Sequence, residues 1–365
     1  MAEKTTIRRL ARRFDLKIVS PTSLTIRRKR RGRGFSYETA DGTALKDAEE
    51  LARLRRLAVP PAYRNVCFAA DPRAHLQAVG EDAAGRLQYR YHPDWTLVRE
   101  TLKADRLSGL AQALPRILRS VRRELRQPSS PRRFALAAVV QLVALTAIRA
   151  GSEEYALEHG TRGATTLLKS HLRLKDDEVA LAFKGKGGKP IRKQCRDADL
   201  ARALAQLKEI PGARLFKYRG EDGGIYAVRG ADVNVFLKAI SGQAISLKDF
   251  RTLTASLGVL DRLGRLEPAG SERGRRQQIR QAIAPLADEL ANTLTVCRTS
   301  YVHDSVISAF ETGKLAKTGP EARSPLARMQ LLSELLRSKG CRPACAGKSV
   351  ARRRTAAIEA VAAAP

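Results

Sequence analysis

The sequence predicts an α+β protein, in which a small β-rich N-terminal domain precedes a mainly α-helical C-terminal domain that contains a three-stranded β meander. Short alternating segments, separated by Asp-Gly and Asp-Pro turn signals, fill residues 35–95. From residue 96 onward apolar residues recur at helical spacing, and one island of strand-like segments interrupts them at 171–195. We therefore divide the chain into a basic N-terminal arm (1–34), the β-rich domain (35–95), the helical domain (96–320) and a C-terminal helix with a disordered basic tail (321–365).

The N-terminal part of the chain changes character near residue 35. The arm ends in RRKRRGRG (27–34), and such a dense basic run is usually solvated and mobile. Within the β-rich domain, residues 44–59 have the pattern of one helix, which stops at Pro60-Pro61.

The helical domain is predicted to begin with basic helices over 97–126. The next segment, 134–155, is apolar nearly all round, which is typical of a buried central helix. The island consists of HLRLK, EVALAF and PIRKQC, three strands of a meander with a Gly-rich tip at 184–189. A long basic helix near 271–291 and a helical segment directly after Tyr301 complete the pattern.

Composition points to a polyanionic partner. The chain carries 68 Lys and Arg against 37 Asp and Glu, a formal charge of +31, and each phosphate neutralised releases condensed counterions. A nucleic acid is therefore the expected partner, and the alternative to an enzyme is a basic protein that coats DNA or RNA without chemistry. No apolar run reaches membrane-spanning length, so we expect no membrane contact.

The five cysteines are scattered and odd in number, which fits a reducing cytoplasm and predicts no metal site. Cys341 and Cys345 alone lie close together, and no histidine near them completes a zinc site.

Three cationic side chains lie where chemistry is possible. Arg149 ends the long apolar run, and it needs an anionic partner there, which Glu153 or Glu154 can supply. Arg251 lies in a helical segment for which a solvated basic face is the simpler interpretation. Lys186 lies on the Gly-rich tip, which can approach a backbone closely but is also a common exposed turn.

Six segments become informative when they are taken together. They are VPPAYRNV (59–66), GRLQYRYHPDW (85–95), IRAGSEEY (148–155), FKGKGGK (183–189), KDFRT (248–252) and ANTLTVCRTSYVH (291–303). In order and spacing they resemble bacterial, poxvirus-like type IB DNA topoisomerases over most of the chain. The resemblance implies that the helical domain is catalytic, with the fold shared by tyrosine recombinases and type IB topoisomerases, and that the β-rich domain binds DNA.

The resemblance also implies a reaction, the relaxation of supercoiled DNA without metal, ATP or another cofactor. Tyr301 is then the nucleophile, which forms a 3′-phosphotyrosine and frees a 5′-hydroxyl. Arg149 and Arg251 clamp the non-bridging phosphate oxygens, and Lys186 protonates the leaving 5′-oxygen. Asn292 stands where poxvirus and eukaryotic relatives have histidine, and its amide donates to a phosphate oxygen.

Further residues are implied as contacts to double-stranded DNA. Gln88, Tyr89 and Tyr91 match a groove-contacting segment, and alternation along a strand places both tyrosine rings on one side. A half-buried aromatic strand is the alternative for these rings. Tyr155 matches a DNA-contacting tyrosine but equally fits a core position, and Lys248 supports the phosphate or the acid. The enzyme is expected to act as a monomer, a two-lobed clamp around duplex DNA in the cytoplasm, associated with the nucleoid.

The sequence departs from the family pattern at two positions beside the chemistry. Leu253 follows KDFRT where bacterial relatives often have tryptophan, and Asp304 follows SYVH where proline is usual. Neither change removes a reacting group, so they bear on the subfamily alone. The nearest alternative is a tyrosine recombinase or integrase, whose second arginine normally lies in a His-x-x-Arg motif, whereas Lys248 precedes Arg251 here.

Overall fold

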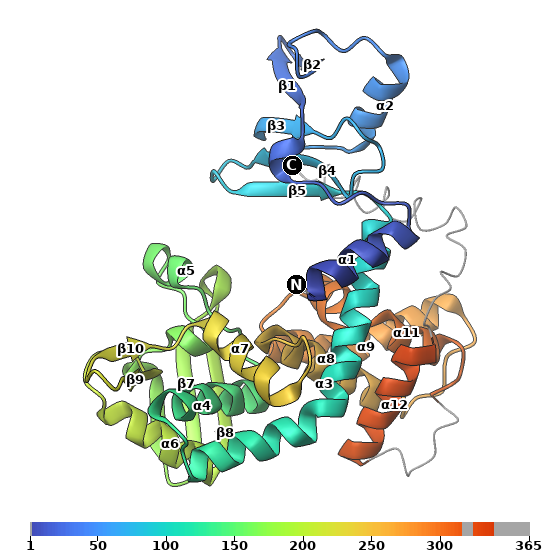
Figure 1. The fold of residues 1–365 in the computed structure, drawn as a ribbon. Helices are drawn as coiled ribbons and strands as arrows, with labels where there is room; N and C mark the ends of the chain where they lie inside the picture. The colour runs from blue at the N-terminus through green and yellow to red at the C-terminus, as the bar shows by residue number, and fades with distance from the viewer. Residues whose placement is uncertain (1, 316–323, 339–365) are drawn as a thin grey trace. The chain divides into compact units, whose positions relative to one another are not determined.

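The computed structural model describes residues 2–315 and 324–338, which form two compact units (Figure 1). The first unit ends at Leu102 and the second begins at Lys103. An antiparallel sheet dominates the first unit and helices dominate the second, so the predicted α+β class is confirmed. Within the described ranges, no helix is long and apolar enough to cross a membrane. The predicted tail from residue 339 onward lies outside the described residues, as do Cys341 and Cys345.

The first unit is built on a five-stranded antiparallel sheet of spatial order β2-β1-β3-β4-β5. The strands are β1 (Ile26–Arg31), β2 (Gly34–Glu38), β3 (Arg64–Phe68), β4 (Leu76–Glu81) and β5 (Leu87–Tyr91). Helix α2 (Ala48–Arg56) packs on this sheet through Leu54, which lies in one buried cluster with Phe68. The carboxylate of Asp47 caps α2 by accepting hydrogen bonds from two backbone N–H groups, so the helix begins later than its apolar pattern predicts.

The basic segment before residue 35 belongs to this sheet, which corrects the expectation of a mobile arm. Strand β1 pairs with both β2 and β3. Within it, the Arg28 guanidinium donates to the carbonyls of Val59 and Pro60 at 3.0 Å and of Tyr63 at 2.8 Å. The same guanidinium lies 4.2 Å from the centroid of the Phe35 ring. A charge that we assigned to solvent therefore holds the loop that carries the VPPAYRNV segment.

A single helix, α3 (Trp95–Arg126), replaces the several basic helices that the sequence predicted over 97–126. It is 32 residues long and contains Pro115. Its first turns belong to the first unit, where Val98 packs against Leu10 of α1 (Ala2–Arg13). The rest of α3 belongs to the second unit. The domain boundary therefore falls inside a helix, where no loop signal marks it.

The second unit is organised around α4 (Pro131–Thr146). Its residues 134–143 are all buried, as the apolar pattern predicted. The helix ends at Ala147, which has the left-handed φ of 50°. It is thus shorter than the predicted segment 134–155, and Arg149 lies in the loop that follows it.

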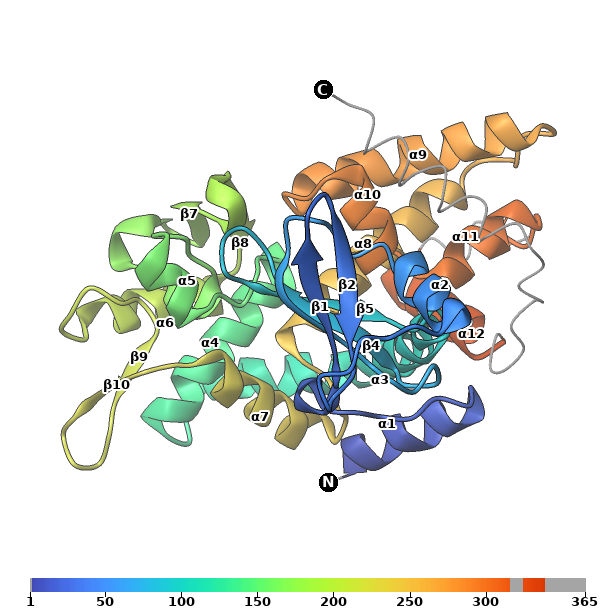
Figure 2. The same cartoon turned by 90° about the horizontal axis from the view of Figure 1, so that it is seen from above.

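Strands and helices surround α4 in the second unit. The predicted meander is present in the order β6-β7-β8, formed by β6 (Leu172–Lys175), β7 (Glu178–Lys184) and β8 (Pro190–Arg196). A short hairpin that we did not predict, β9 (Lys217–Arg219) and β10 (Ile225–Ala227), follows it. The remaining helices are α5 (Glu153–Glu158), α6 (Ala198–Glu209), α7 (Gly230–Ser241), α8 (Leu247–Leu263), α9 (Glu272–Glu289), α10 (Leu294–Val296), α11 (Asp304–Glu311) and α12 (Pro325–Ser338). In Figures 1 and 2 the meander and α6 lie at one end of this unit and α11 and α12 at the other.

Candidate active site

Helix α8 places Arg251 at the centre of the site. The helix begins after Ser246, whose backbone N–H and hydroxyl both donate to the Asp249 carboxylate, at 2.7 and 2.8 Å. Arg251 follows in the next turn and is only 3% exposed. This burial explains why the simpler interpretation of a solvated basic face is wrong for this residue.

The partners of Arg251 are the ends of two other helices. Its Nη1 donates to the carbonyl of Ala147, and its Nη2 donates to the carbonyl of Leu290 at 2.8 Å. Ala147 ends α4 and Leu290 ends α9, so the guanidinium neutralises two helix C-termini that carry partial negative charge. Its third nitrogen, Nε, is buried and has no hydrogen-bond partner within the described part of the chain.

Arg149 and Asn292 follow those same two helix ends and contact each other. Arg149 Nη2 donates to Asn292 Oδ1. The Asn292 amide nitrogen is buried and unpaired among the described residues, so its hydrogen-bonding capacity is unused there. Of the two alternative partners that we considered for Arg149, Glu153 accepts a hydrogen bond from Arg214 instead, and no ion pair joins Arg149 to Glu154 within the described part of the chain.

Tyr301 lies beneath this group of donors. It ends a π-helical turn, η5 (Cys297–Tyr301), a rare geometry that occurs frequently at functional sites. The Arg251 guanidinium carbon is 4.9 Å from the centroid of the Tyr301 ring, and the tyrosine is 8% exposed.

The surroundings of Tyr301 change its acidity. Burial acts to raise the pKa of the phenol, but the positive charge of Arg251 acts in the opposite direction. The charges of Arg149 and Lys248 add smaller effects of the same sign as Arg251, and the net result is a pKa below that of an ordinary tyrosine. The phenolate, which is the nucleophilic form, is thereby stabilised.

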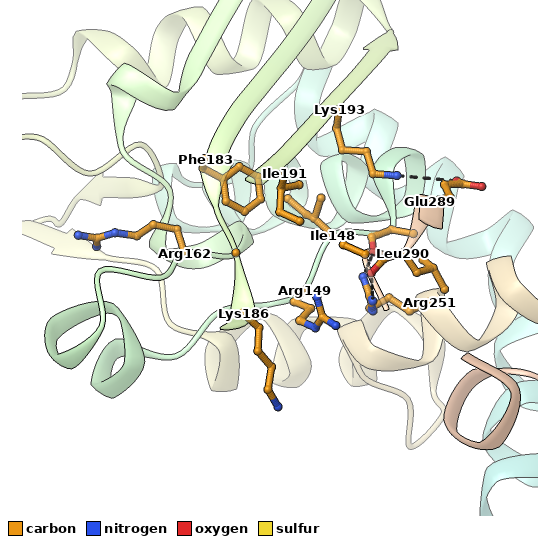
Figure 3. A pocket seen from close by; sticks show the side chains of 13 residues that line it. Ile148, Arg149, Arg162, Phe183, Lys186, Ile191, Lys193, Arg251, Glu289 and Leu290 are labelled. Carbon is orange, nitrogen blue, oxygen red and sulfur yellow. Dashed lines mark hydrogen bonds and ion pairs between the residues drawn. The ribbon is translucent and has the colours of Figure 1, made fainter. Parts of the chain in front are cut away.

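The pocket beside these residues also brings in the tip of the meander (Figure 3). Lys186 lies on that tip, where Gly187 and Gly188 have positive φ values of 71° and 75° and allow the sharp bend. Lys186 and Arg149 line the same pocket, and Figure 3 shows the lysine side chain extending away from Arg251. The exposed amine is therefore available to a ligand that lies over the pocket.

Two further cations in this pocket were not recognised from the sequence. Lys193 on β8 lies 3.9 Å from a carboxylate oxygen of Glu289, and Arg162 precedes the meander. Burial lowers the pKa of Lys193, Glu289 raises it, and Arg251 lowers it further. Lys193 comes two residues after the buried Ile191 on β8 and therefore shares its inward face, so strand alternation is the signal that could have identified it.

The predicted DNA contacts are exposed in both units. Tyr89 and Tyr91 are 40% and 41% exposed, and their rings stack at 6.2 Å on one side of β5, as alternation predicted. Gln88 differs from these contacts, because it is half-buried, lies on the opposite face of β5 from the two tyrosines, and donates to Asp82 at 3.0 Å. Tyr155 on α5 is also exposed, so the alternative of a core position is wrong for it. Lys248 is exposed at the start of α8, one turn before Arg251.

Metal ligands form no cluster in the described part of the protein. Within residues 2–315 and 324–338, no three His, Cys, Asp or Glu side chains are placed to hold a metal ion. The described cysteines, Cys67, Cys195 and Cys297, are free thiols.

A mainly helical unit with a three-stranded meander, in which a buried arginine packs on a buried tyrosine, is the arrangement expected of the class that includes type IB topoisomerases and tyrosine recombinases. Comparison with known families separates the two. The family model for the catalytic core of eukaryotic DNA topoisomerase I matches residues 95–322, and the model for the N-terminal domain of bacterial DNA topoisomerase IB matches residues 34–82. The chain therefore belongs to the type IB DNA topoisomerase family.

The chain is also similar to DNA topoisomerases of three viruses. The chain is similar to DNA topoisomerase 1B of Acanthamoeba polyphaga mimivirus, with 28% identity over 293 residues, which cover 78% of this chain and 87% of the relative. DNA topoisomerase I of Monkeypox virus is 28% identical over 109 residues, and DNA topoisomerase 1B of Vaccinia virus (strain Copenhagen) matches to the same extent. These poxvirus matches cover 30% of this chain and 34% of each relative.

Proposed function

We propose that this protein is a type IB DNA topoisomerase that relaxes supercoiled double-stranded DNA, with Tyr301 as its nucleophile. The observation that carries the proposal is the position of Arg251, which lies 4.9 Å from the Tyr301 ring centroid. Its buried Nε and the amide nitrogen of Asn292 have no partner among the described residues. Buried donors normally find a partner, and an anion held beside the phenol supplies one.

Cleavage begins when the Tyr301 phenolic oxygen attacks a phosphorus atom of one strand. The new P–O bond forms as the bond to the 5′-oxygen breaks, the phenol proton passes to solvent, and Lys186 donates a proton to the leaving 5′-oxygen. The products are a 3′-phosphotyrosine and a 5′-hydroxyl. Religation reverses each transfer, and because the phosphodiester is exchanged and never hydrolysed, no ATP is consumed.

The transition state carries extra negative charge on the phosphate oxygens. Arg149 and Arg251 offer fork-shaped donors to these oxygens, and the Asn292 amide adds a neutral donor. The donors are already fixed by the ends of α4 and α9, so little reorganisation is needed as charge develops. The proposed reaction uses no metal ion and no other cofactor.

Swivelling of the free 5′ end between the two steps relaxes positive and negative supercoils alike. Gln88, Tyr89 and Tyr91 in the first unit, with Tyr155 and Lys248 in the second, are the proposed DNA contacts that hold the duplex meanwhile. The enzyme acts as a monomer at the nucleoid of the cytoplasm.

The decisive experiment is relaxation of a supercoiled plasmid in EDTA without ATP. The wild type should relax the plasmid, and Tyr301→Phe should bind DNA without relaxing it. Tyr226→Phe is the matched control, because this exposed tyrosine bonds only to Asp222 on its own hairpin. Relaxation by Tyr301→Phe overturns the assignment of the nucleophile. Failure of the wild type favours a recombinase that requires its own site, or a protein that only coats DNA.

A further inference from the structure

The backbone leaves helical geometry immediately after Tyr301. The π-helical turn closes with a hydrogen bond from the Val302 N–H to the Cys297 carbonyl at 3.1 Å. Val302 itself is extended, with φ −88° and ψ 127°, and α11 begins only at Asp304. The carbonyl of Tyr301 and the N–H of His303 therefore flank a break in the helix, where no regular helical partner is available to either group.

One side chain satisfies both of these groups. The hydroxyl of Ser256 donates to the Tyr301 carbonyl at 3.0 Å and accepts from the His303 N–H at 3.2 Å. Ser256 is 0% exposed, so water does not compete for these bonds. A hydroxyl can donate one hydrogen bond and accept others, which suits it to bridge a carbonyl and an N–H two residues apart.

Ser256 lies on α8, the same helix that carries Arg251. The two residues are five positions apart on a continuous helix, about 7.5 Å along its axis. One end of this rigid spacer holds the guanidinium over the Tyr301 ring, and the other end holds the Tyr301 backbone. Lys103 on α3 adds a bond from its amine to the Val302 carbonyl at 3.3 Å, so the segment is also held from a second helix.

We infer that Ser256 is a positioning residue, which fixes the Tyr301 backbone at a set distance from Arg251 so that the phenol meets the bound phosphate in line. This inference rests on the proposed role of Tyr301 as the nucleophile. Ser256 has no part in binding DNA, because it is fully buried beneath the tyrosine. Its effect is therefore on the rate of strand transfer and not on affinity.

Ser256→Ala tests the inference. Without the hydroxyl, two buried backbone groups lose their partner and the segment relaxes. A displacement of about 1 Å at a reacting group lowers rates by roughly a hundredfold. We expect the single-turnover rate of covalent adduct formation on a short duplex to fall by about 10- to 100-fold, while the Kd for the same duplex is unchanged. Religation of a preformed adduct should slow by the same factor, because both steps use the same tyrosine position.

Two further variants make the result specific. Thr254→Val removes a hydroxyl from the same helix that bonds only to the Phe250 carbonyl within α8, and it should cleave at the wild-type rate. Ser256→Cys keeps the shape of the side chain, with a slightly larger sulfur atom, but makes weaker hydrogen bonds, so it should fold and show an intermediate rate. It serves in place of Ser256→Ala if that variant does not fold.

The outcomes separate this inference from the proposed function. Wild-type cleavage rates in both Ser256 variants, or losses of DNA affinity that match the losses of rate, overturn the positioning role. Equal slowing by Thr254→Val also overturns it, because the effect then belongs to the helix as a whole. Adduct formation by Tyr301→Phe refutes the proposed nucleophile instead, whatever Ser256 does.

Discussion

Arg149 donates a hydrogen bond to the side-chain oxygen of Asn292, and this bond sets the direction of the amide. The oxygen faces the arginine, so the nitrogen faces the other way, where it is buried and unpaired among the described residues. An asparagine that accepts from one cation is in this way made to act as a donor toward a phosphate.

Changes at Asn292 test this arrangement. Asn292→Ala should slow adduct formation about a hundredfold, the usual cost of one lost donor to a developing oxyanion. Asn292→Asp should be slower still, because a carboxylate pairs with Arg149 and repels the phosphate. Single-turnover cleavage of a radiolabelled duplex measures both. If the aspartate variant is faster than the alanine variant, the amide is not a phosphate donor.

Arg251→Lys should lower the cleavage rate by two to three orders of magnitude (about 10²–10³) although the charge is retained. A lysine amine cannot reach the Ala147 and Leu290 carbonyls and a phosphate at once, as the guanidinium can. The variant should also unfold at a lower temperature, because a buried carbonyl loses its partner at a cost of about 1–3 kcal/mol. Arg262→Lys, on the same helix, is the control, and both can be followed by cleavage assay and thermal denaturation.

The role of Lys186 as the acid can be tested through the leaving group. Lys186→Ala should slow cleavage of an ordinary duplex by roughly a hundredfold or more. In a duplex with sulfur in place of the 5′-bridging oxygen, the 5′ end of the cut strand leaves readily as a thiolate and needs no acid. This substrate should therefore restore most of the cleavage rate of Lys186→Ala. Lys189→Ala, at the other end of the same tip, should behave like the wild type on both substrates. An unchanged defect on the sulfur substrate would mean that Lys186 binds the phosphate and donates no proton.

Ionisation of Tyr301 in the DNA-free protein should occur at lower pH than that of an ordinary tyrosine, whose pKa is about 10. The sign follows from Arg251, which favours the phenolate more than burial disfavours it. The difference in ultraviolet absorbance between the wild type and Tyr301→Phe during an alkaline titration isolates this group. In Arg251→Gln the titration should move to higher pH, because burial then acts without the opposing charge. A phenol that titrates at or above the ordinary value contradicts the prediction.

Trp95 is the chain's only tryptophan and reports on the proposed DNA surface of the first unit. Its ring stacks with Tyr91 at 6.2 Å and an interplanar angle of 23°. Duplex DNA that contacts Tyr91 should therefore change the tryptophan emission, and Tyr91→Ala should abolish the change and weaken binding by roughly tenfold, or about 1.4 kcal/mol. Tyr63→Phe is the control. Tight binding with unaltered emission would place the DNA elsewhere.

The sequence was most informative where local patterns decide the structure. The apolar run predicted the buried α4, alternation predicted the meander, and the resemblance to type IB topoisomerases predicted that Arg149, Arg251 and Tyr301 belong to one site. Its failures have physical reasons. Arg28 looked like a solvated charge because its three carbonyl partners lie more than thirty residues away. The pattern of neighbouring residues in a sequence cannot predict hydrogen bonds between segments so far apart.

Ser256 and Lys193 were missed for a related reason. A serine inside a helix and a lysine on a strand are unremarkable in sequence, and their importance depends on the element that packs against them. The inferred role of the Ser256 hydroxyl depends on its hydrogen bond to the Tyr301 carbonyl, which lies 45 residues later in the sequence. The roles implied for Lys186 and the DNA contacts remain predictions that the experiments above address.

The π-helical turn that ends at Tyr301 makes the orientation of the phenol depend on the number of residues between Asn292 and Tyr301. Each residue of a helical turn rotates the chain around the axis, by about 100° in an α-helix. One residue added or deleted between Asn292 and Tyr301, in α10 or in the π-helical turn, should therefore rotate the phenol away from Arg251. The outward-facing residues of this stretch, such as Thr295, Thr299 and Ser300, are exposed and can change identity without that penalty. The segment should thus tolerate substitutions at its exposed positions, but insertions or deletions of single residues should abolish cleavage, because they change the direction of the Tyr301 side chain.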